Sequence, residues 1–222
     1  MTRIMHISDT HGTFPKLNGS FDCVVHSGDF FPNSPAQYNS KSAEAVFQVE
    51  WMRERLDTFK EWIGNKPYLF TLGNHDFCGD VVLEILLRAH GIKAFALHDK
   101  IVSYEGMNFY GFPYIPYING SFNFEKEIPE MQEECDEMVK ALNTTYVDVF
   151  VCHAPLYGIL DLNSSGHRCG STVMADTFNY KLNTGMQPNA ILHGHIHNAH
   201  GLTTHDGILI SNAATTQNIL EI

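Results

Sequence analysis

The segment NAILHGHIH, residues 189–197, joins a short apolar run to a cluster of histidines, and this arrangement decides the fold prediction. Short apolar and β-branched runs predict buried strands, so the histidines fall at the C-terminal end of a strand. Four other segments have the same form: RIMHIS before Asp9, FDCVVHSGD ending in Asp29, PYLFTLGNHD with Asn74 and His75, and VDVFVCHAP with His153. The sequence therefore predicts five strands that each carry a polar group to one edge of the fold.

Helices are predicted between these strands. Residues 43–63 place apolar side chains three or four positions apart and are followed by Gly64 and Pro67, which predicts one long helix. The same patterns predict helices at residues 83–89, 131–142 and 172–182, a hairpin around Gly106, and strands at residues 207–214 and 216–222. Strands alternating with helices predict the α/β class, whose ligands gather beyond the strand ends.

Composition limits the classes of protein and partner. A chain of 222 residues with 44% apolar content predicts one domain over residues 1–222. Its 25 acidic and 14 basic residues give a net charge of -11, so long nucleic acids are not expected as partners. The five cysteines form no CxxC pair, and no signal peptide or apolar span of roughly 18 residues is present. We expect a cytoplasmic protein without membrane contact; composition leaves the oligomeric state open.

The polar residues after the strands suit metal binding. Asp9 and His11 lie two positions apart, so in an extended chain both side chains point to one side and can hold one cation. Asp29 follows Gly28, and its two carboxylate oxygens can bridge two ions. With the amide oxygen of Asn74 and the later histidines, this mixture of oxygen and nitrogen suits divalent transition metals rather than calcium.

The segment 193–200 contains four histidines, and their spacing does not show which of them bind metal. His193, His195 and His197 face the same way on an ideal strand, so spacing alone does not choose between them. His6 and His26 lie inside apolar strands and are interpreted as buried supporting residues rather than ligands.

The ordered set of motifs resembles the calcineurin-like metallophosphoesterase superfamily over nearly the whole chain. The motifs are Asp9-x-His11, Gly28-Asp29, Gly73-Asn74-His75-Asp76, His153-Ala154-Pro155 and Gly194-His195-x-His197. FYGFP, HAPLYGILD, HRCGS and HGHIHNAHG further resemble its metallophosphoesterase-domain-containing branch, which is similar to class III cyclic-nucleotide phosphodiesterases. The resemblance implies a four-layer αββα sandwich of two mixed sheets, with a dinuclear metal site at the strand ends.

Site roles also follow from the resemblance. It implies that one metal is held by Asp9, His11 and His197, that the other is held by Asn74, His153 and His195, and that Asp29 bridges them. The two divalent ions are expected to be Mn, Fe, Zn or Co, with Mn favoured. His193 is then expected to be buried beneath the site and His200 to lie at its rim.

His75 takes the place of the general acid in this resemblance. Family members often have an acidic or amide residue three positions after the bridging aspartate, where this chain has Pro32; Asn33 comes one position later. The partner that orients His75 is therefore open at the level of sequence.

The resemblance implies a metal-dependent phosphoesterase. We expect a phosphodiesterase that hydrolyses small phosphodiesters such as cyclic nucleotides, by in-line attack of a metal-bridging hydroxide with His75 as general acid. The alternatives are a phosphomonoesterase or nuclease using the same site, and a non-enzymatic metal-binding scaffold, which the complete set of ligands disfavours. Arg168 is a candidate substrate contact because a guanidinium binds phosphate oxygens in pairs, although most surface arginines are only solvated.

Overall fold

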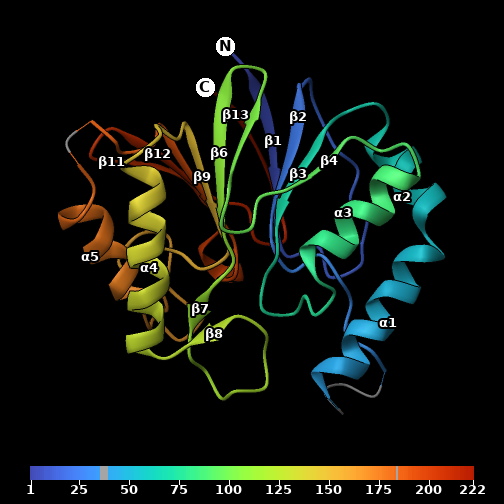
Figure 1. Cartoon of the computed structure of the whole chain (residues 1–222), viewed down its shortest axis with the longest axis horizontal. Coiled ribbons are helices and arrows are strands. Elements are labelled where there is room, and N and C mark those ends of the chain that lie inside the picture. The colour runs from blue at the N-terminus through green and yellow to red at the C-terminus, as the bar shows by residue number, and fades with distance from the viewer. Residues whose placement is uncertain (36–39, 184) are drawn as a thin grey trace.

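The computed structural model describes residues 1–35, 40–183 and 185–222, in which two mixed β-sheets lie face to face (Figure 1). The first sheet has the order β13 (Gln217–Glu221), β1 (Arg3–Ile7), β2 (Cys23–Ser27), β3 (Tyr68–Thr71) and β4 (Ala94–Ala96). The second has the order β11 (Gly201–His205), β12 (Ile208–Asn212), β10 (Ala190–His193), β9 (Val149–Cys152), β6 (Met107–Phe112) and β5 (Ile101–Tyr104). In both sheets the central strands are parallel. Antiparallel strands form both edges of the second sheet and the β13 edge of the first, whose other edge strand, β4, is parallel to β3.

Helices cover the outer faces of both sheets (Figure 1). Against the first sheet lie α1 (Lys41–Arg53), α2 (Leu56–Ile63) and α3 (Asp80–Ala89); against the second lie α4 (Ile128–Leu142) and α5 (Thr172–Tyr180). The short strands β7 (Ile115–Pro116) and β8 (Glu125–Lys126) pair with each other, and a 3₁₀ turn, η1, covers His197–Ala199. Among the described residues, no helix is long and apolar enough to cross a membrane.

Three apolar clusters hold the layers together. Neighbouring strand residues alternate between faces, so Met5 joins the cluster under the first set of helices while Ile4 joins the cluster between the sheets. The inner cluster also takes Val25 and Leu69 from the first sheet and Val149 from the second. A third cluster packs α4 and α5 on the second sheet. The αββα order confirms the expected fold class.

The predicted helix over residues 43–63 is wrong as a single element. The chain forms α1 and α2 instead, with Arg55 in a non-helical conformation between them. Val46, which the apolar spacing assigned to the core, is 59% exposed, whereas Glu44 and Gln48 of α1 are buried. The buried face of α1 is partly polar because Glu44 and Gln48 contact polar turns near the site. The chain changes direction after α1, and α2 then buries the apolar side chains of Phe59 and Ile63.

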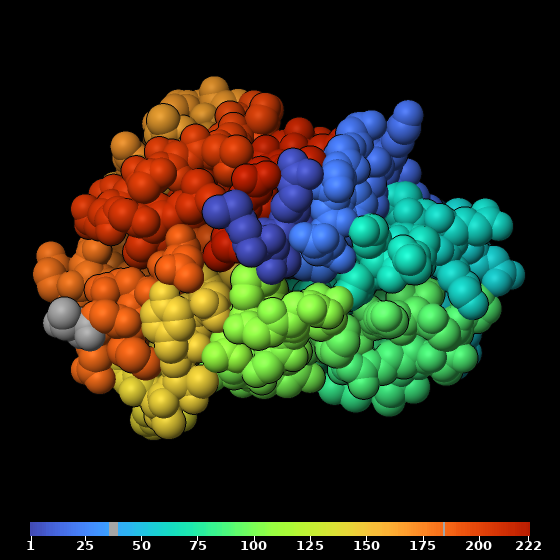
Figure 2. Space-filling view, turned by 90° about the horizontal axis from the view of Figure 1, so that it is seen from above, coloured from blue at the N-terminus to red at the C-terminus, as the bar shows by residue number. Residues whose placement is uncertain are grey.

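The two ends of the chain lie side by side. Strand β13 pairs antiparallel with β1 along its whole length, and Figure 2 shows the N-terminal residues next to C-terminal ones at the surface. This pairing places the last strand at an edge of the first sheet, although the three strands before it, β10, β11 and β12, belong to the second sheet. The hairpin around Gly106, the strands near the C-terminus and the other three predicted helices are confirmed. Helices α3 and α4 each begin three residues earlier than expected, and α5 ends two residues earlier.

His6 joins the two sheets through hydrogen bonds. Its side chain is fully buried, with Nδ1 2.7 Å from Ser211 Oγ of the second sheet and Nε2 2.9 Å from Ser27 Oγ of the first. Burial lowers the pKa of His6 well below its usual value, so the neutral ring donates one hydrogen bond and accepts the other.

We therefore expect His6→Ala to destabilise the fold. The substitution removes the His6 hydrogen bonds of two buried hydroxyls, of which Ser211 keeps its bond from Asn218, and it opens a cavity, so the free energy of unfolding should fall by about 2–4 kcal/mol. Urea denaturation measures this change. His205→Ala, at an exposed histidine of β11, is the matched control, and an equal midpoint for both variants would contradict the bridging role.

Candidate metal centre

Abrupt turns at the strand ends bring the polar residues together. Asp9, His11, Asp29 and His195 have φ values of 54°, 43°, 57° and 68°, in the left-handed region that is uncommon for residues other than glycine. Such conformations cost about 1–3 kcal/mol each and cluster at functional sites. Asp9 and His11 do reach the same space, but through left-handed turns and not through the extended geometry assumed from the sequence.

Gly28 allows the two sheets to approach closely here. Its φ is 109°, and a Cβ at this position would lie 2.5 Å from His153 Nδ1 and 2.8 Å from backbone atoms of Gly73. No side chain fits between these turns, so glycine is required for His153 of the second sheet to reach the turns of the first.

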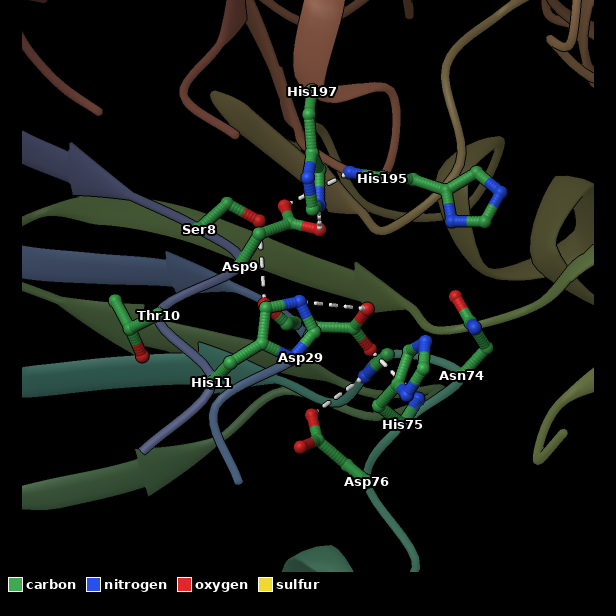
Figure 3. Close-up of polar contacts among 12 residues, drawn as sticks. Ser8, Asp9, Thr10, His11, Asp29, Asn74, His75, Asp76, His195 and His197 are labelled. Carbon is green, nitrogen blue, oxygen red and sulfur yellow. Dashed lines mark hydrogen bonds and ion pairs between the residues drawn. The ribbon is translucent and has the colours of Figure 1, made fainter. Parts of the chain in front are cut away.

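Asp9 gathers the first group of predicted ligands. Its carboxylate Oδ1 lies 3.2 Å from His197 Nε2, and Oδ2 accepts a hydrogen bond from the backbone N–H of His195 at 2.9 Å (Figure 3). Ligand atoms of Asp9, His11 and His197 all lie within 4.8 Å of one another. Burial alone raises the pKa of Asp9, but the hydrogen bond from His197 and the charge of His153 outweigh it and keep the group ionised.

Asp29 lies between the two groups. The same oxygen, Oδ2, is 3.9 Å from His11 Nε2 and 3.3 Å from His153 Nε2, while Oδ1 accepts the backbone N–H of His75 at 2.8 Å. Burial on its own raises the pKa of Asp29, yet the charge of His153 and its hydrogen bond hold that pKa well below the usual range. An ionised carboxylate with one oxygen facing both groups has the placement that a bridging ligand needs.

His153 presents its Nε2 atom to the second group. Its Nδ1 donates to the carbonyl oxygen of Ser27 at 2.9 Å, which fixes the ring and turns Nε2 toward Asn74 Oδ1 at 2.9 Å. Burial lowers the pKa of His153, but the charges of Asp29 and Asp9 raise it to about 9. The surrounding oxygens therefore favour a positive charge at this place, which a proton or a metal ion can supply.

The structure places the histidines of residues 193–200 in different environments. His195 packs against His153 with 5.0 Å between ring centroids, and burial lowers its pKa to about 4, so its ring is the neutral form that binds metals. His193 is fully buried, as expected, and its Nε2 has no hydrogen-bond partner within the described residues. His200 is exposed and donates from Nδ1 to the carbonyl oxygen of His197 at 3.0 Å.

Asn33 supplies the contact to His75 that the sequence left open. Its amide oxygen Oδ1 lies 3.0 Å from His75 Nδ1, and because an amide oxygen only accepts, the ring nitrogen donates. The His75 ring also packs edge-on against His11, with 5.1 Å between centroids. Asn33 comes one position later than the residue that family members often have here, yet its amide still reaches His75.

Two supporting residues were missed by the sequence analysis. The fully buried Asp76 accepts backbone N–H groups of Phe30, Phe31 and Gly73 at 3.2, 2.9 and 2.8 Å, which joins the turns after β2 and β3. Burial, with the charge of Asp29, raises the pKa of Asp76 to about 7 against the effect of these hydrogen bonds.

Gln48 of α1 holds the same turn from outside. Its Nε2 donates to the His75 carbonyl oxygen at 2.7 Å, and its Oε1 accepts the N–H groups of Phe77 and Cys78. The place of Asp76 within GNHD was an available signal, whereas nothing in the local sequence marks Gln48.

Arg168 is engaged in a structural contact. Its Nη1 lies 2.8 Å from Oδ1 of the buried Asp161, and the guanidinium carbon lies 5.9 Å from the centroid of the Tyr157 ring. Asp161 also accepts the N–H of Gly158, so this pair organises the loop that follows β9. Substrate contact by Arg168 stays a prediction.

A hollow of about 330 Å³ opens over the site. It is lined by His11, Asp29, Asn74, His75, Ile118, Phe122, Asn163, His195, Ile196, His197 and Asn198. None of these described lining residues is lysine or arginine, so the side chains of the hollow offer no permanent positive charge.

Comparison with known proteins identifies the family. The calcineurin-like phosphoesterase profile matches residues 2–199. The chain belongs to this family. Metallophosphoesterase domain-containing protein 1 of Homo sapiens is 24% identical over 90% of this chain, which spans 62% of that protein's length. A UPF0046 protein of Caenorhabditis elegans is 27% identical, with 96% of this chain and 69% of the relative aligned.

Solved structures agree on the fold. TT1561 of Thermus thermophilus superposes with a TM-score of 0.61 at 12% identity, covering 96% of this chain and 89% of that one. A further crystal structure reaches a TM-score of 0.71 at 16% identity, with 96% and 90% covered. The clustered aspartates and histidines of this family member are placed where they could hold a metal ion.

Asp76 gives a test of how the site is built. Asp76→Ala leaves three buried backbone N–H groups without an acceptor, so we expect the free energy of unfolding to fall by about 2–4 kcal/mol and metal affinity to fall with it. Urea denaturation and calorimetric Mn²⁺ titration measure the two effects. Asp206→Ala, at an exposed turn, is the control; equal behaviour of the two variants would refute the role of Asp76.

Proposed function

We propose that this protein is a phosphodiesterase that hydrolyses small phosphodiesters such as cyclic nucleotides. The observation that carries the proposal is the composition of the hollow, whose described lining contains His75 and five of the seven predicted ligands but no lysine or arginine. The resemblance of FYGFP, HAPLYGILD and HGHIHNAHG to the metallophosphoesterase-domain-containing branch supports the same substrate class.

Charge favours a diester over a monoester. A phosphate monoester carries close to two negative charges at neutral pH, because its second pKa is about 6. Enzyme sites often hold such terminal oxygens with arginine or lysine. A diester carries one negative charge and needs less compensation. A hollow whose only strong charges are one carboxylate, Asp29, and the predicted metal ions therefore fits the diester better.

The chain's own residues divide into ligands and a proton donor. Asp9, His11 and His197 would hold one ion, Asn74, His153 and His195 the other, and Asp29 would bridge them. Two such ions, with Mn²⁺ favoured, would activate water and neutralise phosphate charge. The left-handed turns and the contacts from Asp76 and Gln48 fix these side chains before substrate binds.

His75 is placed to protonate the leaving oxygen. Asn33 accepts the hydrogen of Nδ1, which leaves Nε2 as the nitrogen that can face a ligand in the hollow. The step requires the imidazolium form of His75, with a second hydrogen on Nε2. The P–O bond to the alcohol breaks as the attacking oxygen bonds to phosphorus, and the departing oxygen takes the Nε2 proton, which leaves a neutral ring whose Nδ1 hydrogen still points to Asn33.

Substrate preference tests the proposed class directly. With Mn²⁺-loaded protein we expect turnover of bis-p-nitrophenyl phosphate and of a cyclic nucleotide, and at least about tenfold lower kcat/KM for p-nitrophenyl phosphate. A preference for the monoester would establish the phosphomonoesterase alternative. A loaded protein that turns over no phosphoester would establish the scaffold alternative.

Replacement of His75 tests the proton donor. We expect His75→Ala to lower kcat for a cyclic nucleotide by about 10²–10³-fold, because its leaving alkoxide needs a proton. The loss for bis-p-nitrophenyl phosphate should be much smaller, since p-nitrophenolate leaves readily without one. Equal losses for the two substrates would contradict the general-acid role and indicate a structural effect.

Asn33 is expected to act through His75 by orienting its ring. Asn33→Ala should lower kcat for a cyclic nucleotide about tenfold with little change in KM, because the ring loses its fixed direction. Asn33→Asp keeps an oxygen in the same place and should retain most of the activity. Steady-state kinetics on metal-loaded proteins compares the variants, and similar losses in both would show that the hydrogen bond to His75 is not the cause.

A further inference from the structure

The loop between β7 and β8 presents apolar side chains at the mouth of the hollow. Ile118 is 50% exposed although it is a large apolar residue, and Phe122 lines the same hollow. Both stand among histidines, asparagines and a carboxylate. Figure 1 shows this loop below the two sheets, projecting from the second half of the molecule.

Hydrogen bonds hold this loop in one shape. The carboxylate of Glu125 accepts the backbone N–H groups of Ile118 and Asn119 at 2.9 Å each and that of Phe122 at 3.1 Å. Asn119 in turn accepts the N–H of Ser121 at 2.9 Å. Ile118 is thus fixed by its backbone at the mouth, and a contact with a ligand there would cost little ordering entropy.

The loop is also attached to the turn that carries His75. The backbone N–H of Asn123 donates to the carbonyl oxygen of Asn74 at 2.9 Å, and its side-chain amide donates to the carbonyl oxygen of Asp76 at 2.8 Å. The Phe122 ring lies 5.1 Å from the His75 ring between centroids. These contacts set the distance between the apolar side chains and the proton donor.

We infer that Ile118 and Phe122 form the subsite for the leaving alcohol, and that they contact the nucleoside part of a cyclic nucleotide. This inference rests on the proposed function, because the alcohol must leave on the side of the group that protonates it. His75 has Phe122 against its ring, and Ile118 lines the same hollow. In a cyclic nucleotide the leaving oxygen is a ribose oxygen, and the ribose stays joined to the phosphate through the second ester bond. The sugar therefore lies nearest His75 and its base reaches toward these two side chains.

These two side chains suit a planar heterocycle. An apolar side chain and an aromatic ring bind the faces of bases by dispersion and stacking, without depending on which base is present. The subsite therefore favours nucleosides over small alkyl alcohols and discriminates weakly between adenine and the other bases. It also supplies binding energy that does not depend on charge, in a hollow whose described side chains offer no lysine or arginine.

Paired substrates separate the contact with the base from the chemistry. We would measure kcat/KM for an adenosine cyclic phosphate and for the methyl riboside cyclic phosphate that lacks the base, in the ring isomer that the wild type hydrolyses. Ile118→Ala should lower kcat/KM for the nucleotide about tenfold through KM and leave the base-free compound nearly unchanged. Calorimetric Mn²⁺ titration checks that metal binding is intact.

Tyr117→Ala is the matched control. Tyr117 is 49% exposed, next to Ile118, and lines a different hollow beside α4. We expect its kcat/KM ratio for the two substrates to equal that of the wild type. Equal ratios in wild type and Ile118→Ala would overturn the subsite while leaving the phosphodiesterase intact. Absence of turnover of both substrates by the metal-loaded wild type would overturn the proposed function, and the subsite with it.

Discussion

The buried charge of Asp29 is the constraint on which the site depends. An ionised carboxylate that is only 2% exposed is stable only if surrounding groups compensate it. One oxygen accepts the His75 backbone N–H, and the other faces His11 and His153, so turns after three strands must meet at this side chain. Two of these strands belong to the first sheet and one to the second. The two sheets must therefore pack together in this arrangement for the charge of Asp29 to be compensated.

Polar contacts beneath the ligands meet this requirement. His26 is fully buried; its Nδ1 accepts the Gly28 N–H at 3.2 Å, which leaves Nε2 to donate to the Thr10 hydroxyl at 3.1 Å. It thus joins the turns after β1 and β2, while Asp76 joins those after β2 and β3. These groups are costly to bury unless each is paired, and the left-handed turns add strain. The apolar clusters on both sides of each sheet offset that cost.

Sequence predicted what is encoded in local patterns. The five strands followed from short apolar runs, whereas the αββα layers followed only from the family resemblance. The break at Arg55 was missed because the spacing of apolar residues does not show which side of a helix faces the rest of the protein. Helix α1 buries a partly polar face, from which Gln48 contacts the site. Left-handed φ values and the contact from Asn33 also escaped, since both depend on how distant turns meet.

Charge balance links metal loading to substrate affinity. The protein carries a net charge of -11, and two buried carboxylates stand at the site. A phosphodiester approaching these carboxylates alone is repelled, whereas two divalent ions reverse the local charge. In the proposed reaction the same ions would bind substrate and activate water. A change at the metal ligands would therefore alter substrate affinity and the rate of the chemical step together. Discrimination among substrates must then come from uncharged surface, and Ile118 and Phe122 provide it beside the proton donor.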